Sequence, residues 1–106
     1  MAFVVALCSC GGAPHETIGA SAETIEACVS VCVKQSTDCP TESKLTGDQC
    51  EVGCRGKGED ADDIGCGQEW HEYVGCVARH IEDACNELFH CADSKVSWAV
   101  CESEAD

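Results

Sequence analysis

Basic residues and larger apolar side chains are both scarce in this 106-residue sequence. It has 6 Lys and Arg against 20 Asp and Glu, which gives a formal net charge of −14. Such a chain offers no positive surface for phosphate groups, so a nucleic-acid-binding protein is excluded. Leu, Ile, Val and Phe together make up less than a fifth of the residues. A chain with this charge and so few apolar residues needs something other than a large hydrophobic core to fold.

Long hydrophobic runs and catalytic motifs are also missing. The apolar run MAFVVAL at residues 1–7 is far shorter than the roughly 20 residues that a transmembrane helix needs. There is no nucleophile elbow, phosphate-binding loop or arguable pair of catalytic carboxylates. The sequence therefore predicts a protein that is not an enzyme and that has no catalytic residues.

Cysteine, in contrast, is abundant. The 12 cysteines are more than a tenth of the chain, which is typical of a small disulfide scaffold in an oxidising compartment. The length suits one domain. We therefore expect disulfides to hold a single small fold together.

Residues 7–12 (LCSCGG) resemble the lipobox of bacterial lipoproteins, in which an aliphatic residue and two small residues precede the cysteine that is acylated. The resemblance implies a signal-peptide remnant at residues 1–9, lipidation of Cys10, and a flexible tether at residues 10–21. It places the protein in the bacterial cell envelope, lipid-anchored to a membrane and either periplasmic or surface-exposed. Cleavage before Cys10 leaves ten further cysteines, an even number that can pair completely.

Residues 22–106 are expected to form a cysteine-rich, all-α domain. Apolar residues at helical spacing predict a helix over residues 22–34. A capping-box pattern at Thr46 and Gln49 predicts the start of a short second helix, which Gly56 is expected to end. Residues 56–63 are predicted to form an acidic linker. Helical spacing also predicts a helix over 65–80, a continuation or a short extra helix over 81–88, and a last helix over 93–102.

The cysteine spacing predicts how these helices are joined. Cysteines four apart lie on one face of a helix, so two such helices packed antiparallel can be joined twice. Cysteines ten positions apart also face one neighbour, which predicts a second stapled hairpin. Ten cysteines permit many hundreds of pairings, and we favour the one that antiparallel packing selects. Its pairs are Cys28–Cys54, Cys32–Cys50, Cys66–Cys101 and Cys76–Cys91. Cys39 and Cys85 then remain, and their pair would tie the two hairpins together.

The two halves of this pattern resemble known families. The second hairpin resembles the twin Cx9C proteins of the mitochondrial intermembrane space, and the first resembles the twin Cx3C small chaperones of that compartment. The whole order of cysteines, together with the lipobox-like start, is similar to small cysteine-rich lipoproteins of myxobacteria and other delta-proteobacteria. This last resemblance implies a fold and a compartment, but no activity.

Other candidate residues have plain structural interpretations. The bulky aromatics Trp70, Tyr73, Phe89 and Trp98 are expected to pack over disulfides, and only secondarily to form a ligand or partner surface. Residues 60–65 (DADDIG) fail the calcium-loop pattern and are expected to be a solvated linker. The four histidines are expected to be exposed, so neither a metal nor a cofactor is predicted.

We therefore expect a non-enzymatic binding or interaction module whose partner is an unknown protein or a cationic molecule. One alternative is a divalent-metal or thiol-redox protein that uses His71, the carboxylates of Asp60, Asp62 and Asp63, or an unpaired thiol. The other is a mitochondrial intermembrane-space protein of the twin Cx9C type.

Overall fold

The computed structural model describes residues 17–40 and 44–105, and the regular structure there is entirely helical. Its elements are α1 (Ala22–Asp38), α2 (Gly47–Asp63), α3 (Gly67–Arg79), the 3-10 helix η1 (Ile81–Asn86) and α4 (Leu88–Glu104). The all-α prediction is confirmed. No helix in the described ranges is long and apolar enough to cross a membrane. Cys10, the predicted lipidation site, lies outside the described residues.

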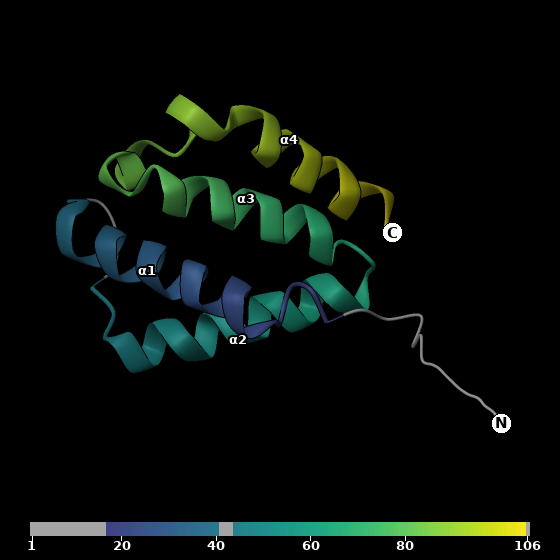
Figure 1. Ribbon diagram of the computed structural model, residues 1–106, viewed down its shortest axis with the longest axis horizontal. Coiled ribbons are helices and arrows are strands. Elements are labelled where there is room, and N and C mark those ends of the chain that lie inside the picture. Colours follow the sequence, from purple (N-terminus) through teal and green to yellow (C-terminus); the bar gives the residue numbers. More distant parts are fainter. Residues whose placement is uncertain (1–16, 41–43, 106) are drawn as a thin grey trace, which may run out of the picture.

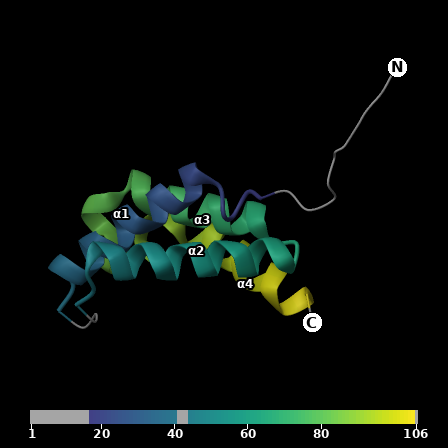
Figure 2. The same ribbon diagram turned by 90° about the horizontal axis from the view of Figure 1, so that it is seen from below.

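The helices form two antiparallel hairpins, α1 with α2 and α3 with α4 (Figure 1). Helix α3 lies at the centre, because it packs against α1, α2 and α4. Viewed from below, α2 is nearest the reader (Figure 2). The apolar face predicted for α3 is buried as expected, with Trp70, Tyr73, Val74 and Val77 in the core.

Five disulfides staple these elements. Cys28–Cys54 and Cys32–Cys50 join α1 to α2, while Cys66–Cys101 and Cys76–Cys91 join the second hairpin. Cys39–Cys85 links the end of α1 to η1 and so ties the two hairpins together. These are the five predicted pairs, and all ten cysteines in the described part of the chain are used.

Helix α2 is much longer than the sequence predicts, and this is the main correction to the predicted secondary structure. It continues through Gly56 and through the predicted acidic linker as far as Asp63. Each glycine weakens a helix by about 1 kcal/mol, but tertiary contacts compensate. Ala61 is completely buried, and Gly58 lies against the backbone of Gly19.

The other helix boundaries also differ from the prediction. Helix α1 runs on to Asp38, so Cys39 follows the helix directly instead of lying in a loop. Helix α4 starts at Leu88 but has non-helical backbone angles at Cys91, so the chain kinks where the Cys76–Cys91 disulfide is attached. Phe89 was expected to cover a disulfide, yet 68% of its surface is exposed. It precedes the kink, on the side of α4 that does not enter the core.

The predicted capping box at the start of α2 is present. Thr46 Oγ1 accepts a hydrogen bond from the Gln49 backbone N–H at 3.1 Å, and Gln49 Oε1 accepts one from the Thr46 N–H at 2.8 Å. The cap therefore satisfies two backbone donors that a helix start otherwise leaves free.

Replacing Thr46 with Ala should lower the free energy of unfolding by about 1 kcal/mol, because it removes the cap from a helix that already contains several glycines. Chemical denaturation of the oxidised protein measures this. Ser97→Ala is the matched control, since Ser97 is exposed within α4, and it should change stability by less than about 0.5 kcal/mol. Equal effects of the two substitutions would contradict a role for the cap.

Candidate functional site

A cleft of about 240 Å³ lies where the two hairpins meet over α3. Residues of α1, α2, α3 and α4 line it, so it exists only when both hairpins are packed together. Its apolar lining residues are three aromatic residues, three valines (Val31, Val74 and Val77) and the disulfide-bonded Cys28 and Cys32. We name this feature the aromatic cleft.

Three of the four aromatic residues singled out in the sequence form one wall of the aromatic cleft. The ring centroids of Trp70 and Trp98 are 5.1 Å apart, and those of Trp70 and Tyr73 are 6.0 Å apart. All three side chains are at most 7% exposed. Tilted rings at these separations are favourable, so this wall is a fixed surface. Phe89, the fourth aromatic, is not among the lining residues.

Two lysines lie beside this wall, and neither was predicted from the sequence to be a site residue. The Lys57 ammonium lies 5.9 Å from the centroid of the Trp70 ring, and the Lys95 ammonium lies 5.0 Å from that of Tyr73. Lys95 Nζ also donates to the Tyr73 hydroxyl at 3.5 Å. Both lysines are exposed and both line the aromatic cleft. They come from α2 and α4, so no local sequence pattern could have shown that they meet.

A hydrogen-bonded carboxylate, Glu87, also lines the aromatic cleft. Gln35 Nε2 is 2.8 Å from both Glu87 Oε2 and the backbone oxygen of Ala84 in η1. The amide thus donates to the carboxylate and holds it in place. The lining therefore holds two ammonium groups, Lys57 and Lys95, and one carboxylate.

One donor in the wall has no partner. The indole Nε1 of Trp70 is inaccessible to solvent and has no hydrogen-bond acceptor among the described residues. A buried donor left unpaired costs about 1–3 kcal/mol. The indole N–H is therefore a local energetic cost of packing Trp70 into the core.

The histidines are not all isolated and exposed, as the sequence suggested. His71 is half-buried, with Nδ1 2.7 Å from the Thr24 hydroxyl. The rings of His80 and His90 stack with centroids 4.1 Å apart, because the turn through η1 folds α4 back onto the end of α3.

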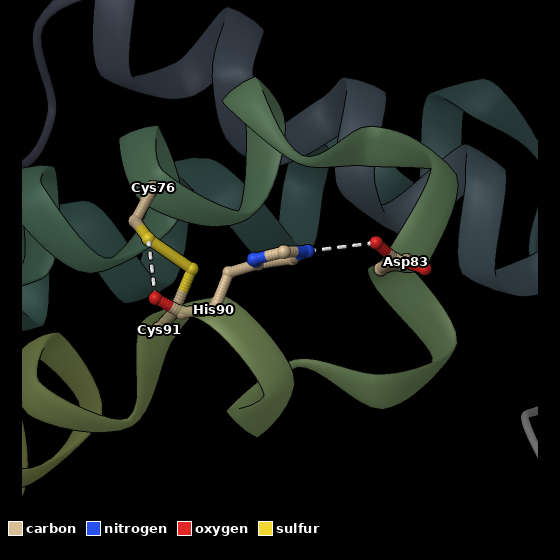
Figure 3. A network of polar contacts seen from close by, with 4 residues as sticks. All are labelled: Cys76, Asp83, His90 and Cys91. Atoms are coloured by element: carbon tan, nitrogen blue, oxygen red, sulfur yellow. Dashed lines mark hydrogen bonds and ion pairs between the residues drawn. A yellow bond between two sulfur atoms is a disulfide. The ribbon is translucent and has the colours of Figure 1, made fainter.

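His90 also contacts the carboxylate of Asp83. Figure 3 shows its ring reaching toward Asp83, whose carboxylate lies 2.8 Å from Nε2. On the other side, the Cys76 sulfur lies 3.7 Å from the His90 backbone oxygen. That sulfur belongs to the Cys76–Cys91 disulfide and carries no hydrogen, so the contact is van der Waals only. The arrangement braces the kink in α4.

The ligand set proposed for a metal or redox protein is not brought together. Asp62 accepts hydrogen bonds from the backbone N–H groups of Gly19 and Ala20 at 2.8 and 3.0 Å, while His71 is bound to Thr24. Asp60, Asp62 and Asp63 lie in the last turn of α2 instead of in a loop.

In the described ranges, the one cluster of three metal-ligating side chains is Cys66, Glu69 and Cys101. Its two sulfurs are joined as a disulfide. They are therefore not thiolate ligands in this oxidised state.

The bonds to Asp62 reveal an unexpected contact of the predicted tether. Residues 17–21, which we name the N-terminal strap, lie against α2 and α3 instead of extending away. The Asp62 carboxylate holds the strap backbone, and Thr24 Oγ1 donates to the oxygen of Ile18 at 2.8 Å. The packed domain thus begins several residues before residue 22, and residues 1–16 lie outside the described part.

Comparison with known proteins gives no relative from which a function could be transferred. No protein-family model matches this chain, no curated protein matches it, and no solved structure matches it.

Proposed function

We propose that this protein is a non-enzymatic binding module of the bacterial cell envelope, held at a membrane by lipid on Cys10. The observation that carries the binding role is the aromatic cleft, a small hollow with a rigid apolar wall and charged groups at its edge. Binding sites in proteins commonly combine a mostly apolar surface with a few placed polar groups.

The disulfides support a location outside the reducing cytosol. Five bridges in so small a domain are typical of exported proteins, and they keep both hairpins in register around the aromatic cleft. The lipobox-like residues 7–12 support lipid anchoring in particular. The acidic outer faces would attract cationic molecules or cationic partner proteins non-specifically.

Mass spectrometry of the mature protein from its native membrane fraction tests the anchoring. We expect the chain to begin at Cys10 and to carry at least a diacylglyceryl group, since two acyl chains suffice for stable anchoring. The Cys10→Ser variant should lack the lipid and leave the membrane fraction, whereas Ser9→Ala should keep both. An intact, unmodified Met1 or a disulfide on Cys10 would contradict the proposal.

A second candidate, a metal or thiol-redox protein, rests on the cluster of Cys66, Glu69 and Cys101. Reduction of that disulfide would create two thiols beside a carboxylate, a set that can bind zinc. Thiol counting and metal analysis of the native protein separate the two functions. The binding module requires no free thiol among the ten paired cysteines and no stoichiometric metal, whereas bound zinc or two reactive thiols would favour the second candidate.

A further inference from the structure

We infer that the aromatic cleft binds a small amphipathic organic anion, with its apolar body against the aromatic wall and its carboxylate beside Lys57 and Lys95. This inference rests on the proposed binding function and specifies its ligand class. It follows from the placement of charge, from the size of the cleft and from the occupied state of the aromatic faces.

The placement of charge is the strongest argument. Only 6 residues of the whole chain are Lys or Arg, against 20 Asp and Glu, yet two of the lysines border the same cleft. Neither makes an ion pair within the described ranges, where Lys34 and Arg55 pair with carboxylates one helical turn away. In so acidic a protein, two unpaired ammonium groups at one hollow form a local positive site.

The contacts of these lysines leave them available to a ligand. Each ammonium lies over an aromatic face, a weak attraction at exposed positions. A carboxylate beside them would add a charge-assisted hydrogen bond without displacing the rings. The two lysines belong to different hairpins, so a ligand that fills the cleft would contact both halves of the domain.

The same contacts disfavour a cationic ligand. Aromatic walls often bind quaternary or primary ammonium groups through the ring faces, but here Lys57 and Lys95 already lie over Trp70 and Tyr73. The lining has one carboxylate, Glu87, which accepts a hydrogen bond from the neutral amide of Gln35 at 2.8 Å, so the two lysines leave the lining with an excess of one positive charge.

The volume limits the apolar body. About 240 Å³ lies below the range of about 300–1,000 Å³ found for drug-sized ligands. The valines Val31, Val74 and Val77 line the cleft beyond the aromatic rings. A short fatty acid or a single-ring aromatic acid fits this space, whereas a folded peptide or a long lipid does not.

Three probes with the same alkyl chain separate the contribution of the head group. Octanoate, 1-octanol and octylammonium are titrated into the oxidised protein, and tryptophan fluorescence is followed. Both tryptophans of the chain, Trp70 and Trp98, line the aromatic cleft, so the signal reports on this site. We expect octanoate to bind most tightly, 1-octanol more weakly, and octylammonium most weakly.

Substitution of the lysines tests the site itself. Lys57→Gln and Lys95→Gln should each raise the Kd for octanoate roughly fivefold, the effect of losing one partly exposed charge contact. The Kd for 1-octanol should stay unchanged. Lys44→Gln removes the same charge from an exposed position that is not in the lining, and it should leave the Kd for octanoate within twofold. Circular dichroism of each variant verifies that the helices are intact.

The outcomes distinguish the ligand class from the binding function. If 1-octanol or octylammonium bound as tightly as octanoate, the inferred anion would be wrong while the cleft would remain a binding site. If Lys44→Gln weakened octanoate as much as the cleft variants did, general charge would explain the preference and the inference would fail. If no probe changed the fluorescence, both the inferred ligand and the cleft as the site of the binding function would be overturned.

Discussion

Complete reduction of the disulfides should unfold the domain and abolish its helicity. The five bridges span sequence separations from 15 to 46 residues. Closing loops of these lengths stabilises a fold by about 3–4 kcal/mol each, according to the loop-entropy estimate. A domain of this size has a total stability of only about 5–15 kcal/mol. Loss of all five bridges therefore removes more stabilisation than the core can replace.

The composition of the core explains why it cannot compensate. Of the buried apolar residues, Cys39, Cys50, Cys54, Cys66, Cys76 and Cys91 are themselves disulfide partners. The remaining core is a thin layer around α3, with two tryptophans, one tyrosine and a few aliphatic side chains. Reduction would thus break the disulfides and disturb the packing of the core at the same time.

Far-ultraviolet circular dichroism during reduction, followed by thermal melts, measures this effect. Two double variants measure how the loss of stability depends on the length of the loop that each disulfide closes. Cys39→Ser with Cys85→Ser opens the loop of separation 46, and Cys76→Ser with Cys91→Ser opens the loop of separation 15. The first pair should cost more, by about 1 kcal/mol. A fully reduced protein that kept its helicity and a cooperative melt would show that the hydrophobic core alone holds the fold.

The disulfide framework could be read from the sequence because helical spacing restricts pairing. Cysteines four apart, such as Cys28 and Cys32, must lie on one face of a helix, and antiparallel packing then leaves one partner for each. The same logic gives Cys66–Cys101 and Cys76–Cys91. Helical spacing is local and can be inferred from the sequence, and antiparallel packing of neighbouring helices supplies the rest of the pairing.

Features that depend on distant contacts without a cysteine pattern could not be predicted. Gly56 looks like a helix end, but α2 continues because Asp62 and Gly58 bind the N-terminal strap more than 35 positions earlier in the chain. The aromatic cleft was only partly foreseen. Trp70 and Trp98 stood out by their size, whereas Lys57 and Lys95 are single lysines on different helices with no spacing pattern.

Glycine substitutions in α2 should have opposite effects on stability according to what lies beside them. At Gly53 an added Cβ would meet no atom within 4 Å. Gly53→Ala should therefore stabilise the protein by about 0.5–1 kcal/mol, the usual gain of alanine over glycine inside a helix. Denaturant unfolding of the oxidised protein measures this gain.

At Gly58 the same methyl group has no room. An added Cβ would lie 2.6 Å from the carbonyl carbon of Gly19 and still closer to its oxygen. The opposing position is equally tight, since a Cβ on Gly19 would lie 2.6 Å from the Gly58 oxygen. Two backbones touch here, so no side-chain rotation can relieve the clash, and overpacking of this kind typically costs 1–3 kcal/mol.

Gly58→Ala should consequently lower the free energy of unfolding by about 1–2 kcal/mol, after the gain in helix propensity is subtracted. It should also release the N-terminal strap. Hydrogen exchange of the Gly19 and Ala20 amides, which donate to Asp62, should accelerate in Gly58→Ala and stay unchanged in Gly53→Ala. Asp62→Ala should reproduce the faster exchange without adding a methyl group, because it removes the acceptor itself. If Gly58→Ala stabilised the protein as Gly53→Ala does, the strap would not be packed on α2 in solution, and residues 17–21 would belong to the tether as the sequence alone suggests.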